Sequence, residues 1–218
     1  MTTSAVASSH YPVQFAVDYP DRPLNRMSSA FRILAAIPIL VVLVAVSGSG
    51  FSLARSSEHA AAGAGGVLCF APLLMILFRR KYPRWWFDWN VELQRFTSRV
   101  AVYLALMDDR YPSTDEQQSV RLDYVYPDAE RDLNRWLPLV KWLLAIPHFI
   151  VLFFLWVAAL VVVVLAWFAI LFTGRYPRGM FDFVEGVMRW DQRVIAYALV
   201  LTTDRYPPFS LAADSGAR

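Results

Sequence analysis

Long uninterrupted runs of apolar residues dominate this chain and alternate with short charged stretches. Residues 34–46 and 67–78 contain no charged residue, and residues 137–172 carry only Lys141 and His148 as ionisable groups. Runs of this length are typical of membrane-spanning helices. A buried helical core is the alternative interpretation, but a soluble protein would need more polar surface to cover such blocks. The composition, 57% hydrophobic and 18% charged residues, favours membrane insertion.

The apolar runs belong to two copies of one pattern. The segment Arg-Ile-Leu-Ala-Ala-Ile-Pro at 32–38 returns as Lys-Trp-Leu-Leu-Ala-Ile-Pro at 141–147. Each copy closes on Asp-Arg-Tyr-Pro, at 109–112 and 204–207. Because an internal repeat sets the unit of folding, the two copies should share one architecture.

The repeat also predicts the number of spans. The first copy has two apolar runs, 30–46 and 61–78, separated by a connector rich in Gly, Ser and Ala. The second copy has one run of 36 residues, 137–172, which is long for one span and short for two, at about 20 residues each. The first copy is longer by 15 residues, which matches its connector. We therefore predict that the second run turns as a hairpin near residues 155–158.

The basic residues suggest an orientation for these four spans. Arg55 is the only one of the 21 Lys and Arg residues that falls in a predicted hairpin loop. Basic residues concentrate on the cytoplasmic side of membrane proteins, so both termini are expected in the cytoplasm. The predicted location is the cytoplasmic (inner) membrane of a bacterium, with a multi-pass chain.

Together these patterns predict a mainly α, integral membrane fold. It would consist of two tandem two-span repeats (four transmembrane helices), with interfacial amphipathic helices and a short cytoplasmic strand opening each repeat. The expected organisation is a flexible tail at 1–10, a first repeat at 11–113, a second repeat at 120–211 and a flexible tail at 212–218. Residues 13–19 and 120–126 alternate polar and apolar positions, as strands do. We expect these strands to pair with each other; two unpaired extended segments are the alternative.

Two further segments, 87–107 and 181–201, have helical periodicity with a charged stripe. Asp88, Arg95, Arg99 and Tyr103 share their spacing with Asp182, Arg189, Arg193 and Tyr197, so each set follows one helix face. A helix with Arg on one face and large apolar residues on the other suits a membrane interface. Packing of the two stripes against each other is the alternative. The candidate lipid- or partner-binding residues are Arg95, Arg99, Tyr103, Arg189, Arg193, Tyr197, Arg84 and Arg178.

The two aspartates of the stripes and one histidine are further candidates. Asp88 and Asp182 precede their helices' arginines, where a carboxylate caps a helix or forms an ion pair. His148 is an intramembrane polar candidate, since ionisable residues within apolar runs are often functional. The corresponding residue of the first copy is Ile39, so a hydrogen-bonded histidine is favoured over a proton relay.

Catalytic motifs are missing from the sequence. The histidines His10, His59 and His148 lack metal-ligand spacing, and the sequence has no nucleophile elbow, no phosphate-binding loop and no paired catalytic carboxylates. No metal, no cofactor and no enzymatic activity are therefore expected.

The motifs Leu-Leu-Ala-Ile-Pro-His, Phe-Thr-Gly-Arg-Tyr-Pro-Arg-Gly-Met-Phe-Asp-Phe and Asp-Arg-Tyr-Pro-Pro-Phe-Ser-Leu resemble a bacterial membrane protein family, domain of unknown function 4389. The resemblance covers residues 11–211 and is closer in the second copy. It implies an integral membrane protein with repeated units and carries over no activity.

The expected function is that of a non-enzymatic accessory or scaffold module in the membrane. It would bind anionic lipid or a membrane complex through its cytoplasmic Arg/aromatic face. A small oligomeric transporter or channel is the alternative, although the predicted spans offer little polar lining. The expected partners are membrane lipids, a membrane protein complex or further copies of the chain, and no nucleic acid.

Overall fold

The computed structural model describes residues 11–47, 73–114, 116 and 118–213 of the chain. The predicted tail at 1–10, most of the first copy's connector with Arg55, and residues 61–72 of its second apolar run lie outside the described residues. His10 and His59 lie outside them as well, as do residues 214–218 of the predicted C-terminal tail.

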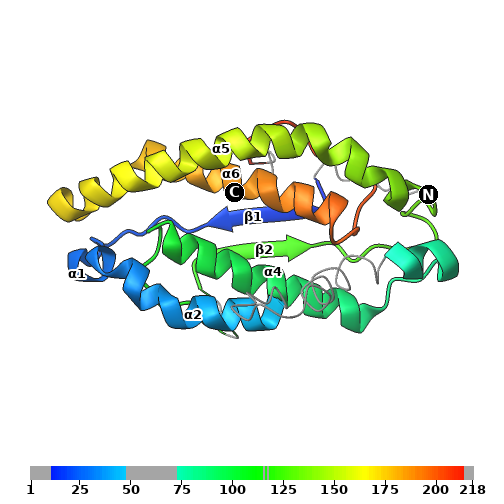
Figure 1. Cartoon of the computed structure of the whole chain (residues 1–218), viewed down its shortest axis with the longest axis horizontal. Helices are drawn as coiled ribbons and strands as arrows, with labels where there is room; N and C mark the ends of the chain where they lie inside the picture. The colour runs from blue at the N-terminus through cyan, green and yellow to red at the C-terminus, as the bar shows by residue number, and fades with distance from the viewer. Residues whose placement is uncertain (1–10, 48–72, 115, 117, 214–218) are drawn as a thin grey trace, which may run out of the picture.

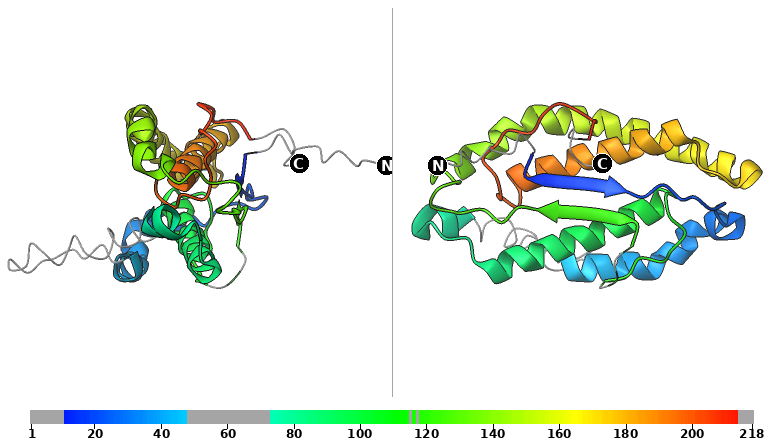
Figure 2. Two further views of the ribbon diagram at one scale, coloured as in Figure 1. Left: turned by 90° about the vertical axis from the view of Figure 1, so that its right-hand side faces the viewer. Right: turned by 180° about the vertical axis from the view of Figure 1, so that it is seen from behind.

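The described chain is mainly helical, with one small sheet. Its elements are β1 (Val13–Val17), α1 (Arg26–Ala30), α2 (Arg32–Ser47), α4 (Arg84–Leu104), β2 (Val120–Tyr124), α5 (Leu137–Thr173) and α6 (Arg178–Ala198). Residues 73–79 are also helical. The helices α5 and α6 run side by side along the long axis, and the view of Figure 1 draws α2 and α4 below the strands and α5 and α6 above them. Seen along that axis, α2 and α5 lie on the side away from the sheet (Figure 2).

The two predicted strands exist and pair with each other. They are antiparallel, with Phe15 opposite Leu122 in the register. The alternation explains the pairing, because Val13, Phe15 and Leu122 are buried while Gln14 and the polar residues of β2 are exposed. The buried face of the sheet packs on α6 and α4.

Of the two predicted interfacial helices, α6 is mostly internal and α4 is partly exposed. Pro83 and Pro177 precede α4 and α6, so both helices begin three residues earlier than predicted. Most of α6 is buried, because α5 covers one side of it and β1 another. Its Phe181 and Val187, for example, belong to the main hydrophobic core. The charged stripe of α6 therefore meets protein rather than a membrane interface.

The prediction of four transmembrane helices in two-span repeats is wrong. Residues 137–173 form one continuous helix of 37 residues, without a hairpin near 155–158. Leu155, Trp156, Val157 and Ala158 include no helix breaker, and the helix ends only at Gly174, whose φ of 73° is left-handed. Among the described residues, α5 alone has the length and hydropathy to cross a membrane. The predicted multi-pass chain with cytoplasmic termini has no support in this part of the structure.

A narrow stripe of α5 makes its contacts with the rest of the protein. The buried residues of the helix recur every three, four or seven positions, which keeps them within about 80° of its circumference. Ala145 packs against Tyr197 of α6, and Leu152 packs against Trp190. The opposite side is apolar and exposed, with Leu143, Phe153 and Leu160 between 64% and 67% accessible. A hairpin would have interrupted this one-sided packing.

A C-terminal segment, residues 202–213, passes over α6. At their crossing a Cβ atom on Gly186 would lie 2.9 Å from the Leu211 Cβ and 3.0 Å from its carbonyl oxygen. Only a residue without a side chain fits beneath the backbone of Leu211 there. Gly179, the second residue of the same helix, has open space around it.

We expect Gly186→Ala to destabilise the protein by about 1–3 kcal/mol, because the added methyl group forces the segment at Leu211 away from α6. Gly179→Ala is the matched control, and should be neutral or stabilising, since Ala favours a helix by about 1 kcal/mol over Gly. Thermal unfolding in detergent measures both. Equal melting temperatures for the two variants would contradict the close contact at Gly186.

Candidate functional site

The predicted Arg stripes contact the edges of the sheet. Arg189 donates from Nε to the Phe15 carbonyl over 2.9 Å, and Arg95 donates from Nε to the Leu122 carbonyl over 2.9 Å. Phe15 and Leu122 face each other in the strand register. Each arginine therefore satisfies an outward-facing carbonyl of a strand that has no further neighbour among the described residues.

The next arginine along each stripe binds a loop. Arg99 donates to the Ser113 carbonyl over 2.9 Å, and Arg193 donates to the carbonyls of Ser210 (3.2 Å) and Ala212 (3.1 Å). Arg99 is 6% exposed and Arg193 is 2% exposed. Both guanidinium groups thus hold peptide carbonyls inside the fold.

The two tyrosines of the stripes lie beneath buried cations. The Arg32 guanidinium is 4.2 Å from the ring centre of Tyr103, and the Lys141 ammonium is 5.2 Å from that of Tyr197. Both tyrosines are buried. Each tyrosine therefore contacts a cationic residue of an apolar helix inside the protein and does not lie at the surface.

Arg84 and Arg178 are the predicted binding residues that stay at the surface. They are the first residues of α4 and α6. Each guanidinium lies over a tyrosine ring: Arg84 over Tyr126 (5.4 Å), and Arg178 over Tyr19 (4.4 Å). Their positive charge remains accessible to an anionic ligand.

Asp88 and Asp182 lie at the fifth residues of their helices rather than at the caps. The N-caps are Pro83 and Pro177, which make no side-chain capping bond. Asp182 forms an exposed ion pair with Arg178 at 3.4 Å. Exposed pairs of this kind contribute little to stability.

Two buried ion pairs, absent from the sequence prediction, connect the apolar helices to the Asp-Arg-Tyr-Pro motifs. Lys141 of α5 contacts Asp204 at 2.7 Å and is 0% exposed, and Arg32 of α2 contacts Asp109 at 2.5 Å and is 2% exposed. The carboxylates of Asp109 and Asp204 also accept the backbone N–H groups of Asn25 and Asn134. The signal in the sequence is that an Asn, a cationic residue and an Asp recur in the same order in both halves of the chain.

His148 lies between α5, α6 and the C-terminal segment. It is fully buried, accepts a hydrogen bond at Nδ1 from the Trp190 indole (3.1 Å), and stacks on Phe209 with ring centres 4.0 Å apart. Its Nε2 has no hydrogen-bond partner in the described part of the chain. These surroundings are aromatic and closed, so His148 packs the C-terminal segment onto α5.

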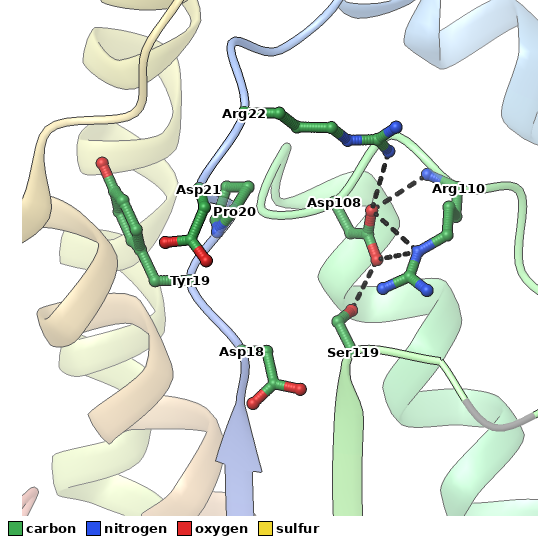
Figure 3. A pocket seen from close by; sticks show the side chains of 8 residues that line it. All are labelled: Asp18, Tyr19, Pro20, Asp21, Arg22, Asp108, Arg110 and Ser119. Atoms are coloured by element: carbon green, nitrogen blue, oxygen red, sulfur yellow. Dashed lines mark hydrogen bonds and ion pairs between the residues drawn. The ribbon is translucent and has the colours of Figure 1, made fainter.

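A hollow of about 400 Å³ lies at the end of β1 and the start of β2 (Figure 3). It is lined by Asp18, Tyr19, Pro20, Asp21, Arg22, Asp108, Arg110 and Ser119. Asp108 accepts hydrogen bonds from Ser119 Oγ (2.6 Å) and from the backbone N–H (3.1 Å) and Nε (3.1 Å) of Arg110. Arg22 approaches the same carboxylate to 4.0 Å.

The electrostatics of Asp108 indicate a structural role. Burial by itself would raise the pKa of Asp108, but the hydrogen bonds from Ser119 and Arg110 hold the pKa below its ordinary value. A carboxylate with a lowered pKa and several bound donors is a poor general base. In the described ranges, 11–47, 73–114, 116 and 118–213, there is also no group of three or more His, Cys, Asp or Glu residues that could hold a metal ion.

We expect Asp204→Asn to lower the free energy of unfolding by about 3–5 kcal/mol, because Lys141 would stay buried without its carboxylate. Asp182→Asn removes an exposed ion pair between an aspartate and an arginine and should change stability by about 0.5 kcal/mol or less. Denaturant unfolding of the detergent-solubilised protein measures both. If Asp204→Asn changes the free energy of unfolding as little as Asp182→Asn does, the buried ion pair does not stabilise the fold.

A half-buried carboxylate makes stability depend on pH. Burial raises the pKa of Asp191 in α6 to about 6, and a hydrogen bond from Trp156 of α5 opposes that rise only in part. A free aspartate titrates near pH 3.9, so the folded state binds this proton more tightly than the unfolded state does. The resulting stabilisation is present below about pH 4 and is lost as the pH rises through about 6.

The substitution Asp191→Asn places an uncharged side chain at this position at every pH. It should raise the free energy of unfolding at pH 7.5 by about 2 kcal/mol and flatten its decline between pH 4 and 6. Unfolding curves at several pH values measure this, with Asp182→Asn as the exposed control. An unchanged pH profile would show that Asp191 is solvated.

Comparison with known proteins adds a family but no function. Residues 136–210, which hold α5, α6 and Asp204, match the family model of a domain of unknown function, DUF4389. Neither the curated proteins nor the solved structures contain a significant match. The similarity to the DUF4389 family therefore covers residues 136–210, the part of the chain that holds α5 and α6.

Proposed function

We propose that the chain is a non-catalytic, membrane-associated module whose working surface is the exposed apolar side of α5 and α2. We call this surface the apolar face. Its α5 part includes Leu143, Ile150, Phe153, Val157, Leu160 and Phe168. Its α2 part includes Ile33, Leu34, Ile37 and Val41.

The exposure of α5 carries the proposal. Only 17% of its most apolar 18-residue window is buried within the protein, although that window has a mean hydropathy of 3.2. The core helix of a soluble protein would be mostly buried. An exposed apolar surface of this extent marks a membrane or protein interaction site. Lipid acyl chains are the simplest material that matches such a surface.

We infer in addition that the chain consists of two copies of one structural unit, because corresponding residues of the two copies make corresponding contacts. Ala36 and Ala145 occupy matching sequence positions, and both are 0% exposed. The buried ion pairs and the arginine bonds to strand carbonyls also occur once in each copy. Duplication explains why both copies present an apolar helix on the same side of the sheet (Figure 2).

Anionic lipid headgroups or a membrane complex are the proposed partners of the remaining exposed cations. Arg84 and Arg178 are accessible. Trp85 and Trp136 are 65% and 64% exposed, and tryptophan is enriched at membrane–water boundaries. Each basic residue near an anionic surface contributes about 1 kcal/mol, so these arginines would add to binding that rests mainly on apolar contacts.

A triple variant tests the apolar face. We expect Leu143→Gln, Phe153→Gln and Leu160→Gln together to lower partitioning into phosphatidylcholine vesicles by roughly 100-fold or more, since each side chain is about two-thirds exposed and contributes about 1–2 kcal/mol. Val125→Gln, at an equally exposed residue after β2, is the matched control and should leave partitioning unchanged. Vesicle flotation after removal of detergent measures both.

The flotation assay also separates the two kinds of contact. Arg84→Gln with Arg178→Gln should weaken binding to vesicles that contain phosphatidylglycerol and have no effect on neutral vesicles. If the wild-type protein fails to float with either composition, the proposed membrane association is wrong. If the triple variant floats as well as the wild type, another surface binds the membrane.

A further inference from the structure

We infer that α5 lies along one leaflet of the bilayer instead of crossing it, so that the apolar face rests in a single lipid monolayer. This inference depends on the membrane association proposed above and specifies its geometry. It identifies the partner surface as the acyl-chain and headgroup boundary of one leaflet, the location of monotopic proteins.

The length of α5 is the first argument. A helix of 37 residues is about 55 Å long, whereas the hydrocarbon core is about 30 Å thick. Matching the two would require a tilt of nearly 60°, beyond the range of about 0–40° that crossing helices adopt. A helix lying in the membrane plane has no such length limit.

The neighbours of α5 are the second argument. The strands lie beside the central part of α5 and follow the same long axis, with α6 between them (Figure 1). If α5 crossed the bilayer, the sheet would share its depth. The side chains of Asp18, Arg121 and Asp123 are 53%, 70% and 74% exposed, and would then face hydrocarbon. Charged side chains at that depth are costly and normally face a protein interior or water.

Irregular backbone is the third argument. The segment 202–213 is neither helix nor strand, and it contacts α5 through the stacking of Phe209 on His148. Phe209 is 54% exposed. Lipid-exposed irregular backbone is not found in the hydrocarbon region, because its polar groups find no partners there.

The in-plane arrangement resolves all three conflicts. The apolar helices α2 and α5 lie on the side of the molecule away from the strands (Figure 2). The cations within these helices, Arg32 and Lys141, are buried against aspartates. The exposed side chains described for α2 and α5 therefore carry no charge, and those of the sheet can remain in water.

Depth measurements on the full-length protein test this orientation. In a background with Cys69→Ser, the variants Phe154→Cys and Arg121→Cys each carry an environment-sensitive nitrobenzoxadiazole label. Phe154 is 65% exposed on α5, and Arg121 is exposed on the sheet. We expect phosphatidylglycerol-containing vesicles to shift the emission of label 154 to the blue and to leave label 121 unchanged. A blue shift of both labels would indicate a crossing helix and overturn the inference.

Thiol accessibility provides a second, independent reading. Arg131→Cys lies before α5 and Arg175→Cys lies after it, and both side chains are exposed. In sealed vesicles, an impermeant maleimide should label both from the same side of the bilayer. Labelling from opposite sides would overturn the inference while leaving membrane association intact.

The same experiments detect the competing occupant, a second copy of the chain. In that case the emission of label 154 would be shifted to the blue in the absence of vesicles, and the protein would not float with lipid. That outcome contradicts the proposed function as well as the in-plane orientation. A protein that floats but has its labels on opposite sides contradicts only the orientation.

Discussion

A buried cation paired with an aspartate determines how the apolar helices sit on the rest of the protein. Lys141 lies near the start of α5, and its partner Asp204 follows the end of α6. Because the ammonium is fully buried, it has no alternative partner in water. The pair therefore places the beginning of α5 beside the end of α6 and makes the two helices antiparallel. Arg32 and Asp109 set α2 against α4 in the same way.

The distribution of polar and apolar groups follows from this arrangement. Arg189 and Arg193 point inward, where their guanidinium groups bind peptide carbonyls. Leucine, valine and phenylalanine side chains cover the outside of α5. In water such a surface would drive association with other apolar material. The same distribution is consistent with a protein that has lipid on one side and cytoplasm or periplasm on the other.

Local features of the fold could be predicted from the sequence, and features set by distant contacts could not. Alternation in residues 13–19 and 120–126 predicted the strands, since that period reflects one buried face. The spacing of Arg189 and Arg193 placed both on one helix face correctly. Their partners were hidden, because Phe15 is 174 residues away and offers only a backbone carbonyl, which no side-chain pattern reveals.

The predicted hairpin in residues 137–172 was wrong for a related reason. The shared motifs predict equal architecture in both copies, and the 15 extra residues of the first copy then predict a loop between two spans. The local sequence around Leu155 favoured a continuous helix, and that preference prevailed. Of the candidate site, the sequence identified His148 and the Arg stripes, but the ion pair at Lys141 required knowledge of which segments meet.

The arginine bonds at the strand edges have a consequence for assembly. A two-stranded sheet normally offers two free edges to any extended peptide, including another copy of the same chain. Here an incoming strand would have to displace Arg189 from Phe15 on one edge and Arg95 from Leu122 on the other. Growth of the sheet by strand addition is therefore blocked from both directions. A higher-order complex of this protein would therefore use surfaces other than the strand edges.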